Sequence, residues 1–107
     1  MAVRREELWR VTDPLNYEVV LTKDRWEHIV LRRRWFSRYY NDLRLACRKP
    51  EAITAEDNDI YYYRPIGRGR TRRYILAVTA EERGARWVQT AYVVDRFTKG
   101  DALIWPE

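Results

Sequence analysis

Residues 60–94 read IYYYRPIGRGRTRRYILAVTAEERGARWVQTAYVV and contain three segments rich in β-branched and aromatic residues. These segments, at 60–66, 72–79 and 86–94, favour β-strands. The connections between them, GRGRT and AEERGA, combine glycine with charged residues and are typical of turns. Because strands joined by short turns pair antiparallel, the stretch predicts a meander.

Shorter strands are expected on both sides of this meander. EAIT at 51–54 precedes it, YEVVLT at 17–22 lies nearer the N-terminus, and ALIW at 102–105 is a weaker candidate near the C-terminus. Residues 1–16 are polar and end in TDPLN, which predicts a turn or an N-terminal arm.

Two helices are expected between the first strand and the meander. Thr22 is a candidate N-cap for a helix through DRWEHIVL, residues 24–31. Three apolar residues share one face of this helix: Trp26, Ile29 and Val30. Ser37 is a candidate N-cap for the second helix, which Pro50 closes. Its apolar residues recur at helical spacing: Phe36, Tyr40, Leu43 and Cys47.

The length of 107 residues suits one compact core and is too short for two ordinary domains. Hydrophobic residues make up 46% of the chain and supply the apolar area that such a core needs. We therefore expect a single domain over residues 1–107, with an N-terminal arm over 1–16. The expected fold class is α+β, with two N-terminal helices packed on an antiparallel meander sheet of about four strands.

The charge balance favours a polyanionic or acidic partner. Lysine and arginine number 21 against 16 acidic residues, which gives a net charge of +5, and the isoelectric point is near 9.6. Almost all of the positive charge is arginine, whose guanidinium group binds phosphates bidentately and stacks on bases. Genomic base composition is the alternative explanation for this choice of residue.

Cys47 is the only cysteine and His28 the only histidine. The sequence therefore predicts neither an intramolecular disulfide nor a metal-ligand cluster of the usual kinds, and we expect chemistry without metal or cofactor in the reducing cytoplasm. The start of the chain lacks the apolar segment of an export signal. No apolar run approaches about 18 residues, so no membrane span is expected. The sequence leaves the oligomeric state open.

Five arginines surround two glycines in RPIGRGRTRR: Arg64, Arg68, Arg70, Arg72 and Arg73. The positive charges of such a hairpin tip repel one another unless an anion is bound, so the tip is a candidate phosphate-binding loop for RNA. The alternative is a solvated tip without a ligand. In the adjoining strand Tyr61 and Tyr63 face one side and Tyr62 the other, so one side is expected in the core. An exposed side can stack on unpaired bases.

In WVQTAYVV, small and polar residues interrupt an otherwise apolar strand. Strict alternation places Thr90 and Tyr92 on one face with Val88 and Val94, and Gln89 on the other. Polar residues inside a central strand either make structural hydrogen bonds or line a cleft, and this stretch alone does not distinguish the two.

His28 lies off the apolar stripe of the first helix, on the side of Leu31 and Trp35. An imidazole can gain or lose a proton near neutral pH, as general acid–base catalysis requires. A solvated, inert surface histidine is the alternative.

The order of these parts is similar to a known family. A helix carrying EHI, a second helix ending in KPEAI, an Arg/Tyr-rich hairpin and a late strand VQTAYVV before LIW together resemble the phage-type branch of the barnase–EndoU–colicin–RelE-like (BECR) nucleases. The resemblance covers roughly residues 17–105. It implies a metal-independent endoribonuclease with a RelE- or barnase-like fold, often a toxin that an acidic antitoxin protein neutralises.

The resemblance also implies a catalytic set of His28, Thr90 and Tyr92, with Arg73 as the basic residue and Arg64 as the second choice. RNA is cleaved when its 2′-OH attacks the neighbouring phosphate, which gives a 2′,3′-cyclic phosphate. His28 is expected to be the base or the acid, and the arginine to stabilise the phosphorane. Thr90 would orient a phosphate oxygen, while Tyr92 would stack on a base or donate a proton.

Two other functions fit the same residues. One is a non-catalytic RNA-binding or ribosome-associated module, which would bind RNA in a salt-dependent manner without turnover. The other is a phage-derived protein-interaction module whose arginines meet an acidic protein.

Overall fold

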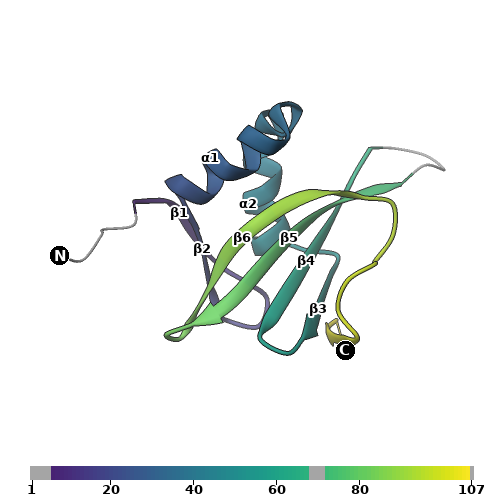
Figure 1. Cartoon of the computed structure of the whole chain (residues 1–107). Coiled ribbons are helices and arrows are strands. Elements are labelled where there is room, and N and C mark those ends of the chain that lie inside the picture. Colours follow the sequence, from purple (N-terminus) through teal and green to yellow (C-terminus); the bar gives the residue numbers. More distant parts are fainter. Residues whose placement is uncertain (1–5, 68–71, 107) are drawn as a thin grey trace.

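The computed structural model describes residues 6–67 and 72–106 (Figure 1). Over these residues the chain forms seven strands: β1 (Glu7–Thr12), β2 (Glu18–Thr22), β3 (Ala52–Glu56), β4 (Asp59–Ile66), β5 (Arg73–Glu82), β6 (Ala85–Val94) and β7 (Ala102–Trp105). The helical segments lie between β2 and β3: α1 (Lys23–Arg32), the 3-10 helix η1 (Arg34–Tyr39) and α2 (Tyr40–Arg48).

All seven strands belong to one mixed sheet, in the order β1-β2-β6-β5-β4-β3-β7. The expected architecture of two helices on an antiparallel meander of about four strands is therefore wrong. The pairings from β3 through β6 are antiparallel, but β2 joins β6 in parallel, with Val19 opposite Arg86. β7 extends the other edge by pairing with β3. The molecule is mostly sheet, with helices on one face.

The N-terminal segment contains a strand where a turn or an arm was expected. β1 pairs antiparallel with β2, and its Trp9 and Val11 are buried on the helix side of the sheet. Apart from Leu8, the other side chains of β1 are polar, so the composition of residues 1–16 conceals the strand.

α1 matches its prediction closely, whereas the second helix does not. Thr22 is the N-cap of α1, but its hydroxyl donates to the Asp24 carboxylate at 2.6 Å rather than accepting from the backbone. The second helix begins at Tyr40 instead of Ser37, because η1 occupies residues 34–39. This tight turn buries Phe36 and leaves the neighbouring Trp35 exposed.

The main core lies between the helices and the sheet. α2 packs on β4 and β5, with Leu43, Ala46 and Cys47 fully buried there (Figure 1). The opposite face carries a smaller cluster around Tyr63 and Leu76. The segment after β6 covers part of it, since the Phe97 ring lies 4.6 Å from the ring of Tyr63.

The tyrosines at 61–63 alternate across β4 as expected. Tyr62 faces the helices, and Tyr61 and Tyr63 face the other way. All are buried, however, and even Tyr61 is only 7% exposed. These three tyrosines therefore present no exposed side that could stack on unpaired bases, and they fill the core instead.

A β-bulge at Gln89 changes which side chains of β6 share a face. Thr90 lies opposite Val78, but Val88 lies opposite the next residue, Thr79, so Gln89 is the extra residue. Val88 therefore faces the helices, while Thr90 and Tyr92 face the other side. The expected grouping of Val88 with Thr90 is wrong for this reason.

In the described part of the chain, no helix has the length and apolar character needed to cross a membrane.

Candidate functional site

α1 runs alongside β6 where that strand has no neighbour on one side. β2 pairs with β6 only as far as Trp87, and within the described residues no strand continues the ladder. At the start of α1, Arg25 and Gln89 line one small pocket. At its end, the guanidinium carbon of Arg33 lies 5.2 Å from the centroid of the Tyr92 ring. α1 therefore follows β6 from Gln89 to Tyr92.

His28 lies in α1 between Arg25 and Arg33, and Thr90 lies in β6 between Gln89 and Tyr92. The helix advances about 12 Å from Arg25 to Arg33, and the strand about 10 Å from Gln89 to Tyr92. His28 is near the middle of the first span and Thr90 near the middle of the second. The two side chains, like that of Tyr92, are half-buried. We call His28, Arg33, Thr90 and Tyr92 the α1–β6 site.

The bulge at Gln89 contributes to this site. It turns Thr90 and Tyr92 away from the helix-side core, and the Gln89 amide donates to the carbonyl of Trp87 at 3.0 Å. Of the two alternatives left open by the sequence, the structural hydrogen bond therefore holds for Gln89. Thr90 is half-buried on the face of the sheet away from the helices.

Arg73 does not join Thr90 and Tyr92. It begins β5 on the helix side, where it lines a pocket with Val93, whereas Thr90 and Tyr92 face the opposite side of the sheet. The guanidinium next to Tyr92 belongs to Arg33 instead. Sequence reasoning missed Arg33, although the arginine run at 32–34 follows the helix of His28 directly and was a signal for it.

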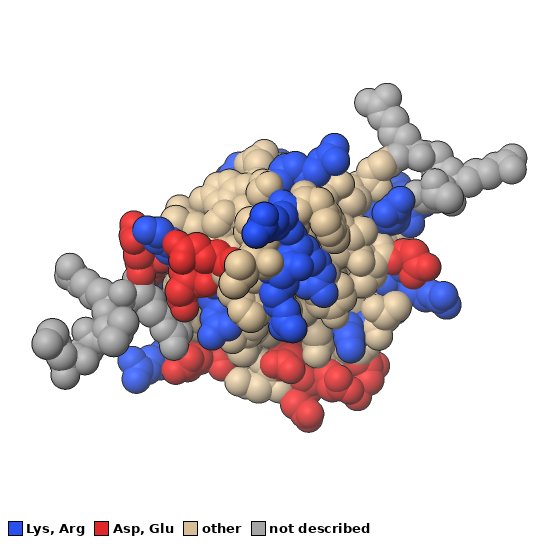
Figure 2. All heavy atoms as spheres, turned by 45° about the horizontal axis from the view of Figure 1, so that its top comes forward, with Lys and Arg blue, Asp and Glu red and all other residues tan. Residues whose placement is uncertain are grey.

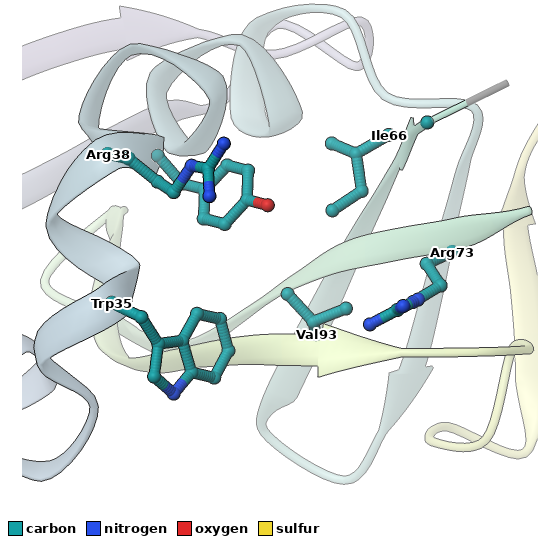
Figure 3. Close-up of a pocket in the computed structure, with 7 residues that line it drawn as sticks. Trp35, Arg38, Ile66, Arg73 and Val93 are labelled. Carbon is teal, nitrogen blue, oxygen red and sulfur yellow. The ribbon is translucent and has the colours of Figure 1, made fainter.

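The pocket that contains Arg73 has a volume of about 650 Å³ and lies between η1 and the ends of three strands (Figure 3). We call it the η1 pocket; its lining residues are Trp35, Arg38, Tyr39, Ile66, Gly67, Arg73 and Val93. Arg38 and Arg73 point into it from opposite sides, and Trp35 lies beside Val93 (Figure 3). No carboxylate is among these residues, so the described lining carries positive charge only.

Arginines on the α1–η1 side form a stripe of positive charge (Figure 2). Arg32, Arg34 and Arg38 are exposed, and none of them makes an ion pair within the described residues. Acidic side chains gather along the lower edge and on the left of the same view. The uncompensated charge makes this face attractive to a polyanion.

Two arginines of the β4–β5 hairpin, Arg64 and Arg72, are engaged with protein. Arg72 forms an ion pair with Glu51 at 3.1 Å, and Arg64 donates to the carbonyl of Lys49 at 3.3 Å. Arg68 and Arg70 lie outside the described residues. The RNA-binding role of this hairpin stays a prediction.

The remaining reactive group is buried. Cys47 is fully inaccessible in α2, and burial raises the pKa of its thiol well above the ordinary range, so it stays protonated at neutral pH. Among the described side chains, no cluster of three histidine, cysteine or acidic residues is arranged to hold a metal ion.

Comparison with known proteins assigns no family to this chain. No protein-family model, curated protein or solved structure matches this chain significantly. The likeness to BECR nucleases therefore stays a hypothesis, and the residues of the α1–β6 site and the η1 pocket carry the functional inference.

Proposed function

We propose that the protein is a metal-independent endoribonuclease that cleaves single-stranded RNA at the α1–β6 site. The observation that carries the proposal is the contact of Arg33 with Tyr92, at the end of the helix that carries the only histidine. RNA cleavage by its own 2′-OH requires proton transfer and a cation that stabilises the phosphorane. A hydroxyl and an aromatic ring can in addition orient a phosphate oxygen and hold a base.

In the proposed reaction His28 accepts the proton of the ribose 2′-OH, whose oxygen then attacks the adjacent phosphorus. Arg33, rather than Arg73, donates hydrogen bonds to the charged phosphorane oxygens. Thr90 donates its hydroxyl hydrogen to a phosphate oxygen, and Tyr92 stacks on a neighbouring base. The bond from phosphorus to the 5′-oxygen breaks, and the imidazolium returns its proton to that oxygen. The products are a 2′,3′-cyclic phosphate and a free 5′-hydroxyl.

The proposal includes where and with whom the protein acts. We place its activity in the cytoplasm, where RNA substrates are present. An acidic antitoxin protein is the proposed inhibitor, because carboxylates on its surface would complement the arginines of the α1–η1 side. RNA and such a protein would then compete for the same face.

The decisive experiment measures cleavage of an end-labelled single-stranded RNA in EDTA. We expect the wild type to produce 2′,3′-cyclic phosphate ends, and His28→Gln to lower kcat by about a hundredfold, since general acid–base catalysis supplies about 10²–10⁴. Arg48→Gln is the control, because Arg48 is exposed in α2 and lines neither of the pockets described above. Equal rates for His28→Gln and wild type would remove His28 from the mechanism.

A second candidate function is RNA binding without turnover. The η1 pocket favours it, because two arginines and two aromatic rings can hold RNA without any acid–base group. This function predicts salt-dependent affinity for RNA, no cleavage products, and an affinity that His28→Gln leaves unchanged. The cleavage assay and a binding titration on the same samples separate the two candidates.

A further inference from the structure

We propose that the η1 pocket binds one nucleotide of a single-stranded RNA, with its phosphate between Arg38 and Arg73 and its base on Trp35. The inference extends the proposed function and rests on it for the identity of the ligand. It assigns Arg73 a role in substrate binding on the face of the sheet opposite to Thr90 and Tyr92.

The charge of the pocket points to an anion. Arg38 projects from η1 and Arg73 from β5, and the two side chains face the same cavity (Figure 3). Neither makes an ion pair within the described residues, and no carboxylate lines the pocket. Two guanidinium groups that share a cavity repel each other, whereas a phosphate between them accepts hydrogen bonds from both.

The aromatic side chains of the pocket suit a nucleobase. Trp35 is 53% exposed, so a large part of its ring can contact a ligand. Its ring stands almost perpendicular to that of Tyr39, at 85° and a centroid distance of 6.3 Å, so Tyr39 does not stack on its face. Ile66 and Val93 add apolar surface at the back of the pocket.

The size of the cavity and its position fit a nucleotide next to the cleavage site. Its volume of about 650 Å³ lies within the range usual for small-ligand sites. Val93 lines the pocket, and the preceding residue, Tyr92, belongs to the α1–β6 site on the other side of β6. Along the chain, Arg33 of the α1–β6 site is followed by Arg34 and then by Trp35 of the η1 pocket. A strand of RNA that passes over this edge of β6 can therefore occupy both.

The test measures binding separately from cleavage. Fluorescence anisotropy with a short single strand that carries 2′-O-methyl groups, and so cannot be cleaved, gives Kd over a range of salt concentrations. The double variant Arg38→Gln/Arg73→Gln is expected to raise Kd about tenfold. It should also flatten the logarithmic salt dependence by about 0.7, the contribution of one phosphate on a single strand. Trp35→Leu should raise Kd about tenfold through the lost stacking.

Arg48→Gln is the matched control, because it removes one exposed arginine that does not line the pocket. A Kd for the double variant equal to that of this control, with an unchanged salt slope, would overturn the pocket assignment. Loss of affinity in the pocket variants of a protein that cleaves no RNA would leave the pocket standing and reject the nuclease proposal. If the protein cleaves RNA but its pocket variants bind RNA as tightly as the wild type, the nuclease proposal is kept and the pocket assignment is rejected. Thermal unfolding of every variant shows that the fold is retained.

Discussion

Arg33 and Tyr92 meet across an edge of the sheet that no described strand covers. Arg33 belongs to the turn between α1 and η1, on the helix side, while the Tyr92 ring faces the other way, so the guanidinium reaches around β6. A guanidinium that stacks on an aromatic ring keeps its donors at its rim, and these can still bind a phosphate. The pair therefore combines a cation and a stacking surface in one place.

Substitutions at Tyr92 distinguish its two possible roles in RNA cleavage. If the ring stacks on a base, Tyr92→Phe should keep kcat/KM within about twofold, and Tyr92→Leu should lower it about tenfold, because the stacking surface is lost. Arg33→Lys should also lower kcat/KM about tenfold, since an ammonium group neither stacks on an aromatic ring nor binds a phosphate bidentately as arginine does. Single-turnover cleavage of a short RNA gives these rates. An activity of Tyr92→Phe as low as that of Tyr92→Leu would instead make the hydroxyl a proton donor.

At the scale of elements, the sequence predicts most strands and the first helix but not their assembly. Residues 60–66 and 72–79 are predicted as strands because they are short runs of β-branched and aromatic residues, and apolar side chains lie on both faces of β4 and β5. The predicted facing of β6 fails at Gln89, because an inserted residue leaves the composition of the strand unchanged while it reverses the faces. The second helix begins at Tyr40, later than predicted, because the aromatic spacing of residues 34–39 fits a 3-10 helix as well as an α-helix.

The segment between β6 and β7 fixes the outer face of the sheet. The backbone N–H of Lys99 donates to the hydroxyl of Tyr63, and its carbonyl accepts from Thr54 at 2.7 Å. Gly100 follows with φ of +83°, and a Cβ on it would lie 2.3 Å from the Thr54 hydroxyl oxygen. Only glycine combines this backbone conformation with so close an approach to β3.

Gly100→Ala is therefore expected to lower the free energy of unfolding by about 3 kcal/mol, from the strained φ and the clash together. Gly84→Ala is the matched control, because Gly84 has φ of +79° but nothing within 4 Å of an added Cβ. Its cost should be about 1 kcal/mol, from the backbone alone. Urea unfolding of both variants measures the difference. Equal losses would show that the contact with Thr54 relaxes without cost.

At the scale of the whole molecule, a buried polar network joins the N-terminal hairpin to the centre of the sheet. The Asp13 carboxylate accepts from the Tyr62 hydroxyl at 2.5 Å and from Arg86 at 3.0 Å. The same guanidinium lies 3.7 Å from the ring centroid of Tyr17. β1 and β2 therefore attach to β4 and β6 through side chains as well as through the short β2–β6 ladder. No sequence pattern indicates this link, because its three partners are 24 to 73 residues apart.

Removing one partner of this network should cost far more stability than removing an exposed ion pair. Arg86→Met leaves the buried Asp13 carboxylate without its cation, and we expect the free energy of unfolding to fall by about 3–5 kcal/mol. Arg10→Met is the control: Arg10 pairs with Glu7 and Glu18 on the surface, and its loss should cost less than about 1 kcal/mol. Urea unfolding at neutral pH measures both. Adding Asp13→Asn to Arg86→Met should recover part of the loss, because the unpaired charge is then gone. A double variant no more stable than Arg86→Met would mean that the guanidinium stabilises the protein mainly through its packing on Tyr17.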